Sequence, residues 1–503
     1  MKQEIFVNST PHETRIAIME DSLLAEFLIE RKEERGIAGN IYKGKVARVL
    51  PGMQAAFIDI GMEKAAFLHA SDFFSMPEDV ELITGVEGGA DADAPPKPAA
   101  HRRLPLEKQI ARGEELLVQV AKDPLGTKGA RVTSHVSLPG RYIVFMPNTK
   151  HVGVSRRIES DQERKRLKEI AQSLLTEDGG FILRTASEGR SKRDIQRDLR
   201  FLTRIWKRIK KKAETTPAPA LIHQDLDLIA RTIRDYFTAD TEQVVIDSAK
   251  DHRRMVDFAR QFMPRVRSKI VLYSEKEPLF DRYGIEEKVQ KALDRRVWLK
   301  SGGYIVIERT EALTAIDVNT GRFVGKRNQE ETIVRTNLEA AQEIVRQLRL
   351  RNIGGIIIID FIDMEKEANR KKVYEALKEA LKKDKARTNI LKISELGLIE
   401  MTRQRTRESL ENQLLSPCPY CDGRGRIKSA VTVAYDVLRA IRKQQPALAN
   451  GKNIIVRLHP DVANFLYDEK SNSLDTLERE INHKIIIKVS ESLRHEQYEI
   501  LPS

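Results

Sequence analysis

The pattern of hydrophobic and polar residues predicts short strands through the first part of the chain. The runs EIFVNS, TRIAIMED and LLAEFLIER fill residues 4–31, and a Thr-Pro-His-Glu turn separates the first two. From residue 39 the pattern restarts with NIYKGKVARVL, QAAFIDIG and AAFLHASDFF, and strand character returns later in ELLVQVAKD. Several short strands of this kind predict a small barrel of five strands.

A segment rich in glycine, alanine and proline interrupts the barrel pattern. Residues 76–108 include GVEGGADADAPPKPAAHRR, which cannot build a core and is expected to form a disordered surface insertion. After the barrel, DQERKRLKEIAQSLL and SKRDIQRDLRFLTRIWKRIKKKAE predict two helices, of which the second is very basic. The following TTPAPALIHQ has the composition of a hinge.

Residues 303–395 show the clearest alternation of strands and helices. YIVIER and ALTAIDV predict a hairpin, a helix follows over about 330–351, and IIIIDF reads as a buried strand. ANRKKVYEALKEALKKD and NILKIS predict one more helix and strand, and NIIVRLH and HKIIIKVS predict a small α/β unit at the C-terminal end. The fold class is therefore a multidomain chain of α+β and α/β parts.

Charge narrows the choice of partners. Lys and Arg number 87 against 74 Asp and Glu among 503 residues, a net charge of +13, which favours a nucleic acid partner over a basic enzyme with a solvated surface. The start MKQEIFVNST lacks the features of a signal peptide, and no apolar run reaches the ~18 residues of a membrane span. With 2 cysteines there is no disulfide framework, so we expect a cytoplasmic protein.

Two aspartates end strands that the pattern predicts to be neighbours. Asp317 ends LTAID and Asp360 ends IIIID, and the helix between them makes a β–α–β unit with parallel strands. Ligands of such sheets bind beyond the carboxyl ends of the strands, so both carboxylates should converge at one edge. Two carboxylates without a nearby cation share a proton or hold a metal, and Mg²⁺ suits such oxygen ligands.

Two more polar residues lie near this predicted edge. Asn319 would share the face of Asp317, where it could orient a water or a phosphate oxygen. Asp363 is a third acidic candidate, with a turn residue as the alternative. For the aspartate pair itself, the alternative to a metal site is that both residues merely end their strands.

The predicted barrel carries two aromatic residues on an outer face. Phe57 alternates with apolar neighbours and shares its face with Asp59, and Phe67 stands on the corresponding face of the next strand. Exposed aromatic rings near basic residues stack on single-stranded bases, and Lys122, which ends the last strand, could meet a phosphate. The segment YKGKVARVLPGMQAAFIDIG resembles an S1 RNA-binding domain. The alternative is that both rings cover a barrel edge or contact another domain.

An arginine and a threonine follow a further predicted strand. In ILRTASEGR, Arg184 and Thr185 precede small residues, so a guanidinium group, a hydroxyl group and backbone amides could surround a phosphate monoester. An ordinary surface pair is the alternative.

Both cysteines lie in SPCPYCDGRGR, residues 416–426. Cys418 and Cys421 are separated by two residues and surrounded by proline and glycine, as in a zinc knuckle. Tetrahedral zinc needs four ligands, and the simplest source of the other two is the same pair in a second chain across a two-fold axis. A redox-active or inert pair, or a site completed by a distant histidine such as His483, is the alternative.

Taken in order, the motifs resemble the ribonuclease E/G family. After the S1-like segment come ILRTASEG, TAIDVNTGRF, GGIIIIDFIDM, LGLIEMTRQRTRESL and CPYCDGRG, and this set spans nearly the whole chain. The resemblance implies an endoribonuclease that cuts single-stranded, often A/U-rich RNA and leaves 5′-phosphate and 3′-hydroxyl ends. The end at residue 503, without a long disordered tail, is typical of the shorter branch of that family.

The resemblance also implies a domain order, with an OB-fold barrel of the S1 type inserted into an RNase H-like domain. The implied domains are the RNase H-like domain in two parts (1–35 and 221–290), the S1 domain (36–133), a 5′-sensor region (134–220), a DNase I-like catalytic domain (291–413), a zinc link (414–428) and a small C-terminal dimerisation domain (429–503).

By the same resemblance, each candidate residue receives a role. Asp317 and Asp360 would bind the catalytic Mg²⁺, Asn319 would complete that site, and Arg387 would be an arginine near the catalytic edge. Arg184 and Thr185 would bind an RNA 5′-monophosphate, and Phe57, Phe67 and Lys122 would bind the RNA strand. Cys418 and Cys421 would bind a structural Zn²⁺ that two chains share.

The cellular roles common in the family are ribosomal RNA processing and messenger RNA decay. The implied assembly is a homodimer, and whether dimers pair into tetramers stays open at the level of sequence. Two other function classes fit the same residues: a non-catalytic S1-type RNA-binding factor, and a metal-dependent enzyme that acts on DNA.

Overall fold

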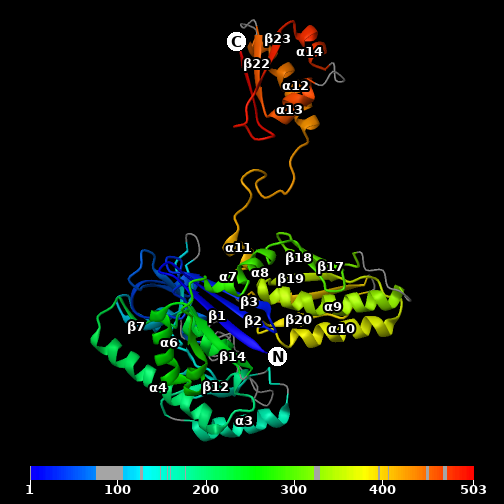
Figure 1. Cartoon of the computed structure of the whole chain (residues 1–503). Helices are drawn as coiled ribbons and strands as arrows, with labels where there is room; N and C mark the ends of the chain where they lie inside the picture. Colours follow the sequence, from blue (N-terminus) through cyan, green and yellow to red (C-terminus); the bar gives the residue numbers. More distant parts are fainter. Residues whose placement is uncertain are drawn as a thin grey trace. The chain divides into compact units, whose positions relative to one another are not determined.

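The chain forms two compact units, Met1–Gln413 and Leu414–Ser503 (Figure 1). None of the helices in the described part of the chain combines the length and the hydrophobicity that a membrane crossing requires. The structure is a computed structural model, and it describes residues 2–74, 106–124, 128–147, 149–155, 157–158, 160–175, 177–238, 240–321, 329–394, 397–405, 407–448, 453–467 and 473–502.

The first strands of the chain share a sheet with strands that come much later in the sequence. β1 lies between β2, which is antiparallel to it, and β14, which is parallel, so that Ile5 faces Ile18 on one side and Val244 on the other. All three side chains are fully buried and pack with the helices that follow. The elements of this part are β15 (Ile270–Leu272), β14 (Thr241–Ile246), β1 (Gln3–Ser9), β2 (Glu13–Glu20) and β3 (Leu23–Arg31), with α5 (Leu228–Tyr236), α6 (Ala249–Phe262), η4 (Pro264–Lys269), α7 (Leu279–Arg282) and α8 (Ile285–Lys291).

A second sheet closes into the five-stranded barrel that the sequence predicts. β4 pairs with both β5 and β7, which joins the two ends of the sheet, and β13 pairs with the start of β4. Val46, Ile58 and Leu68 fill the interior. The elements are β4 (Ile41–Leu50), η1 (Pro51–Met53), β5 (Ala55–Asp59), β6 (Ala66–His69), α1 (Ala70–Phe74), β8 (Arg131–Thr133), β7 (Glu115–Lys122) and β13 (Ala220–His223).

The predicted insertion at 76–108 ends earlier than its composition indicates. Its residues up to 105 lie outside the described part of the chain. Leu106–Lys108, however, form the short helix η2, and Leu106 is fully buried in the barrel core. A leucine that packs against the barrel interior belongs to the barrel, so the boundary at 108 was placed too late.

A four-stranded sheet covered by two helices follows the barrel strand β8 in the sequence and precedes β14 of the first sheet. Ser160 and Ser191 cap the helices α3 and α4 by accepting hydrogen bonds from backbone amides, as residues at such helix starts do. The very basic α4 buries a stripe that includes Leu199 and Leu202 and exposes its basic residues, whereas its Asp198 is buried. The elements are β11 (Val152–Val154), β12 (Gly180–Leu183), β10 (Ile143–Met146), β9 (Leu138–Pro139), α3 (Asp161–Leu174), η3 (Thr185–Ser187) and α4 (Lys192–Thr215).

The sheet that carries both candidate aspartates has six strands. β18 and β19 run parallel at its centre, and their buried isoleucines, Ile316 and Ile359, pack with side chains of α9 and α10. The alternate residues Ala315, Asp317 and Ile356 are exposed, so one face of this sheet meets solvent. The elements are β16 (Arg296–Trp298), β17 (Tyr304–Arg309), β18 (Leu313–Asn319), β19 (Gly355–Asp360), β21 (Leu398–Arg403), β20 (Thr388–Ile390), α9 (Gln329–Leu350), α10 (Glu367–Leu381) and α11 (Leu410–Leu414).

The C-terminal unit has its own core around a three-stranded sheet. β22 and β23 are parallel and β24 is antiparallel to β22. Val437, Val456 and Leu466 are among the buried residues that join the helices to the sheet. The elements are β23 (Lys484–Val489), β22 (Asn453–Leu458), β24 (Tyr498–Pro502), α12 (Ala430–Leu448), α13 (Pro460–Tyr467) and α14 (Ser473–Ile481).

Candidate active site

Asp317 and Asp360 lie opposite each other at the carboxyl ends of two parallel strands. β18 and β19 are paired so that these two residues are register partners, and both are exposed. Asn319 is the last residue of β18, and its Nδ2 donates a hydrogen bond of 2.8 Å to Oδ2 of Asp317. The structure therefore brings three predicted site residues together at one edge of the sheet.

The carboxylates at this edge lie close enough together to repel one another. Partial burial raises the pKa of Asp360 above its usual value, and the nearby carboxylates of Asp317 and Asp363 raise it further. Asp363 thus belongs to the acidic group, although the sequence also allowed a simple turn residue. Repelling carboxylates with exposed oxygens fit a divalent cation, because the ion would remove the repulsion and take the oxygen ligands it prefers.

Arg387 does not join this edge. It directly precedes β20, where Thr388 lies opposite Arg403, and Arg403 in turn pairs with Gly355 at the start of β19. Asp360 ends β19 five residues later, roughly 17 Å away at about 3.3 Å per residue. The structure thus places the backbone of Arg387 near the opposite end of the sheet.

The barrel residues predicted to bind RNA form one row across neighbouring strands. Phe57 pairs with Phe67, and the two ring centroids are 6.0 Å apart in an edge-to-face arrangement. Phe67 pairs with Arg131, and Arg131 pairs with Lys122, which is exposed. Asp72 binds the Arg131 guanidinium with two hydrogen bonds of 2.7 and 2.8 Å. Arg131 was not among the residues predicted from the sequence, although its place on a short strand beside the aromatic pair could have indicated it.

Arg184 is held by an ion pair that the sequence did not reveal. Its Nη1 lies 2.8 Å from Oδ1 of Asp235 on α5 and also donates to the carbonyl oxygen of Gly140. Both bonds use Nη1, which leaves Nε and Nη2 without a protein acceptor among the described residues. Burial raises the pKa of Asp235, but the guanidinium groups of Arg234 and Arg184 outweigh this and hold the pKa below its usual range.

Thr185 lies beside this arginine at the surface. It is exposed and starts the short helix η3, and its hydroxyl is 3.3 Å from that of Ser155. The guanidinium group of Arg184, which Asp235 and Gly140 hold in place, and the adjacent exposed hydroxyl of Thr185 suit the binding of a phosphate group.

The cysteine pair lies in a tight turn of the C-terminal unit. Cys418 is exposed and Cys421 is buried, and the amide of Gly425 donates a hydrogen bond of 3.3 Å to Sγ of Cys421. Hydrogen bonds from the amides of Cys421 and Tyr420 lower the pKa of the Cys418 thiol. Positive φ angles at Gly423 and Gly425 (79° and 71°) allow the turn to fold amides toward sulfur. Thiolates favoured in this way are the form that binds zinc.

A histidine cluster stands close to this turn in the same unit. Ligand atoms of His459, Asp461 and His495 all lie within 4.8 Å of one another, which makes the cluster a candidate for binding a metal ion. The backbone amide of His495 donates to the hydroxyl of Tyr420, between the two cysteines. The distant histidine that the sequence suggested, His483, is not a member of the cluster.

Comparison with known proteins identifies the family. The model of the "Ribonuclease E/G family" matches residues 137–406, and that of the "RNase E/G, Thioredoxin-like domain" matches residues 417–502. The chain is 46% identical to Ribonuclease G of Haemophilus influenzae over 499 residues, 99% of each chain, and 44% identical to Ribonuclease G of Escherichia coli K12 over 501 residues, 100% of each chain. It is 38% identical to Ribonuclease E of Escherichia coli K12, which it covers over 46% of that protein's length.

These relatives bear on the function classes that the sequence left open. Curated relatives matched over their whole length are ribonucleases, which argues against a non-catalytic RNA-binding factor and against an enzyme that acts on DNA. The resemblance stated from the motifs is confirmed. The chain belongs to the ribonuclease E/G family, a family of endoribonucleases.

Proposed function

We propose that this chain is a Mg²⁺-dependent endoribonuclease that cuts single-stranded RNA and leaves 5′-phosphate and 3′-hydroxyl ends. The observation that carries the proposal is the pairing of Asp317 with Asp360 at the ends of parallel strands. The raised pKa of Asp360 supports it, because a pair of carboxylates that repel each other gains most from a shared divalent ion.

In this proposal Asp317 and Asp360 bind the ion, and Asn319 orients the carboxylate of Asp317. When bound, Mg²⁺ supplies positive charge at the scissile phosphate and lowers the pKa of water. The hydrogen bond from Asn319 fixes the carboxylate of Asp317 in one orientation, which reduces the reorganisation that ion binding requires. Asp363 adds negative charge to the same edge and strengthens the attraction for a cation.

The barrel would bind the RNA strand as an S1-type domain. Phe57 and Phe67 are half-buried, paired across two strands, and offer ring surface to bases. Stacking on such rings contributes about 1–3 kcal/mol per base and tolerates any sequence. Arg131, which Asp72 binds, and the exposed Lys122 follow in the same row, so the charge of Lys122 lies near the rings where phosphates of the strand would pass.

Arg184 and Thr185 would bind a 5′-monophosphate and thereby stimulate cleavage. Asp235 and Gly140 fix Nη1 of the arginine, so the remaining guanidinium N–H groups are oriented before the ligand arrives. Binding one end of the RNA at a fixed point orients the strand, which can raise the rate of a distant step.

Cys418 and Cys421 would bind a structural Zn²⁺ together with the same pair of a second chain. The amide hydrogen bonds to both sulfur atoms fit this role, because they stabilise thiolates. The product would be a homodimer with one shared ion.

We also propose the domain assignments that the resemblance implies. The Asp317 sheet would be the DNase I-like catalytic domain, and the sheet of β1 and β14 would be the RNase H-like domain. Ribosomal RNA processing and messenger RNA decay in the cytoplasm would be the cellular roles.

The test uses one 3′-labelled single-stranded RNA in three forms, with a 5′-monophosphate, a 5′-triphosphate or a 5′-hydroxyl end. We expect cleavage with Mg²⁺, none with EDTA, and fastest cleavage of the monophosphate form, with new 5′-phosphate ends on the products. A DNA strand of the same sequence should remain intact. Undiminished cleavage in EDTA would rule out the metal site, and equal rates for the three forms would rule out the 5′-phosphate site.

A further inference from the structure

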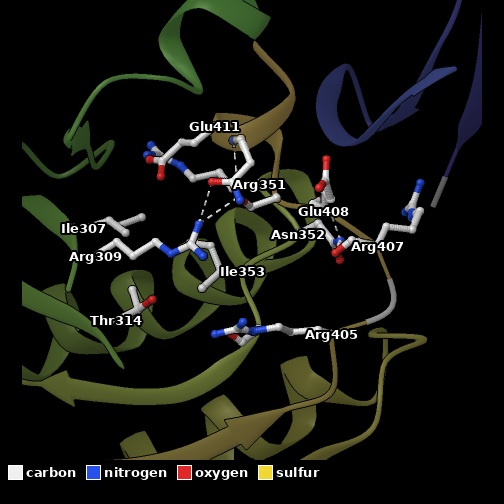
Figure 2. Close-up of a pocket in the computed structure, with 13 residues that line it drawn as sticks. Ile307, Arg309, Thr314, Arg351, Asn352, Ile353, Arg405, Arg407, Glu408 and Glu411 are labelled. Carbon is white, nitrogen blue, oxygen red and sulfur yellow. Dashed lines mark hydrogen bonds between the residues drawn. The ribbon is translucent and has the colours of Figure 1, made fainter. Parts of the chain in front are cut away.

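The sheet with the aspartates has a second pocket, at its other end. The cavity measures about 350 Å³ and lies where the β17–β18 hairpin turns and where the chain passes from α9 into β19 (Figure 2). Gly354, which lines it, directly precedes β19, the strand that ends at Asp360, and Thr314 lies three residues before Asp317 on β18. The pocket shares no lining residue with the proposed metal site or with the Arg184 site, and its Arg407 donates a hydrogen bond to the hydroxyl of Tyr236, the neighbour of Asp235.

Positive charge dominates the lining of this pocket. The formal charges of the lining residues leave two positive charges in excess, which favours an anion, and one of the four arginines, Arg407, also lies 3.8 Å from Glu26 outside the lining. The charged lining residues are Arg309, Arg351, Arg405, Arg407, Glu408 and Glu411.

Arg351 is the residue that points to a ligand. Its side chain is 1% exposed, and its Nε donates a hydrogen bond of 2.7 Å to Oε1 of Gln347. Its Nη1 and Nη2 are buried and have no acceptor among the described residues. Burial lowers the pKa of this guanidinium, and Glu411, the acid that most opposes this, does not form an ion pair with it in the described part of the chain.

A buried guanidinium group whose two Nη atoms have no hydrogen-bond acceptor destabilises the folded state. Leaving a buried charge without a partner strongly destabilises the folded state, so folded proteins rarely keep such a group unless something binds it. Nη1 and Nη2 of one arginine match two oxygens of a tetrahedral or planar oxyanion in a bidentate arrangement. An oxyanion in the pocket would therefore satisfy Arg351.

Two further arginines are already held in place at the exposed side of the pocket. Arg309 Nη1 donates to the side-chain oxygens of Ser409 and Asn412, each at 3.0 Å. Arg405 Nε donates to the carbonyl oxygen of Gly354 at 3.3 Å. Both side chains are exposed, and the bonds in Figure 2 hold Arg309 beside the cavity. An anion that enters would meet one buried and two positioned guanidinium groups.

We propose that this pocket binds the phosphate group of a small phosphate monoester. Its volume lies at the lower end of ligand pockets, ~300–1,000 Å³, which suits a phosphate with a small organic group rather than a long strand. Ile307 and Ile353 provide apolar wall for the organic part, and the guanidinium groups bind the dianion. This binding does not depend on the proposed cleavage activity.

The experiment titrates the full chain with inorganic phosphate and with adenosine 5′-monophosphate by calorimetry, in EDTA. An Arg184→Gln background removes the proposed 5′-phosphate site, so any remaining binding comes from elsewhere. We expect saturable binding of one ligand per chain in this background. Arg351→Met should weaken it at least about tenfold, because the buried bidentate donor is lost. Arg370→Met, on α10 of the same domain, is the control and should bind normally.

Arg405→Gln keeps the result decisive if Arg351→Met does not fold, since Arg405 is exposed and its loss should weaken binding without unfolding the chain. The proposal is wrong if neither probe binds in the Arg184→Gln background, or if the Arg351 and Arg405 variants bind both probes as tightly as the parent. It is also wrong if only a 5′-hydroxyl oligoribonucleotide binds in an Arg351-dependent way, because the ligand would then be an RNA phosphodiester.

Discussion

Lys385 Nζ donates a hydrogen bond of 3.0 Å to the backbone carbonyl oxygen of Asp235. Asp235 is the ion-pair partner of Arg184 in the proposed 5′-phosphate site. Lys385 lies three residues before β20, the edge strand of the sheet that carries Asp317. The proposed site for the RNA 5′ end is therefore in direct contact with a segment of the proposed catalytic sheet.

This contact predicts a specific defect for Lys385→Met. The ratio of cleavage rates for 5′-monophosphate and 5′-hydroxyl RNA should fall toward one, because Asp235 loses the bond that ties it to the sheet. The rate on 5′-hydroxyl RNA should stay within about twofold of the parent. Lys378→Met on α10 is a matched control, since this lysine is exposed in the same domain. A variant with an unchanged ratio would show that the contact does not transmit the effect of the 5′ end.

Asp360→Asn should abolish cleavage while leaving RNA binding intact. Removal of one ligand charge weakens the proposed ion site, and we expect a loss of at least about a hundredfold in kcat, or ~3 kcal/mol in barrier height. Asp363→Asn should cost much less, because Asp363 adds charge to the edge but does not share the paired strands. Gel-based cleavage and fluorescence anisotropy on the same RNA separate the two effects. Equal losses in both variants would contradict the assignment of the ion to the pair.

Phe67→Ala should weaken the binding of single-stranded RNA by about ten- to a hundredfold. The loss corresponds to one stacked base at about 1–3 kcal/mol, and it should be insensitive to the base sequence. Met53→Ala, at a residue 60% exposed on the same barrel, is the control for a general surface effect. Binding measured on oligouridylate and oligoadenylate would reveal a different role if Phe67→Ala affected only one of them.

The sequence predicted the aspartate pair because its geometry follows from local rules. Two strands that each carry an aspartate at or near the carboxyl end, joined by one long helix, have few alternatives to a parallel neighbouring pair, and the register then brings Asp317 to Asp360. The barrel was predictable for a similar reason, since alternating apolar residues such as Val46 and Ile58 fix which face turns inward.

Other parts of the site depend on contacts that no local pattern encodes. Asp235 reaches Arg184 across two parts of the fold, because α5 packs in the core of the first sheet whereas Arg184 follows β12 of the four-stranded sheet. Arg387 is kept from the aspartate edge by the pairing of β20 with the far end of β21. The pocket that Arg351 lines gathers three separate stretches of the chain, 307–314, 351–354 and 405–412, so its charged residues cannot be recognised as one group along the sequence.

Asp198 should make the stability of the α4 region depend on pH. Burial raises its pKa from 3.8 to about 6, although the backbone amides of Tyr142 and Ile143 donate to its carboxylate. The unfolded carboxyl loses its proton first as pH rises, so the native state loses stability between about pH 4 and pH 6, and the loss is complete above that range. Two pKa units correspond to about 3 kcal/mol.

The variant Asp198→Asn cannot ionise, so its stability relative to the parent should increase between pH 4 and pH 7. In a Trp298→Phe background, Trp206 on α4 is the remaining tryptophan of 2 in the chain, and its fluorescence reports on this helix during urea unfolding. A stability difference that does not change with pH would mean that the pKa of Asp198 is not raised in the folded chain.

The zinc content of variants should show whether the cysteine turn or the histidine cluster binds the ion. If two chains share one ion through Cys418 and Cys421, the parent should carry half a zinc per chain, and Cys418→Ser should lose both the zinc and the dimer. His459→Ala should keep both, because the ligand atoms of its cluster belong to a different candidate site. Native mass spectrometry gives the metal count and the oligomeric state together. A full zinc per chain that disappears with His459→Ala would instead assign the ion to the histidine cluster, and the cysteines would then need another role.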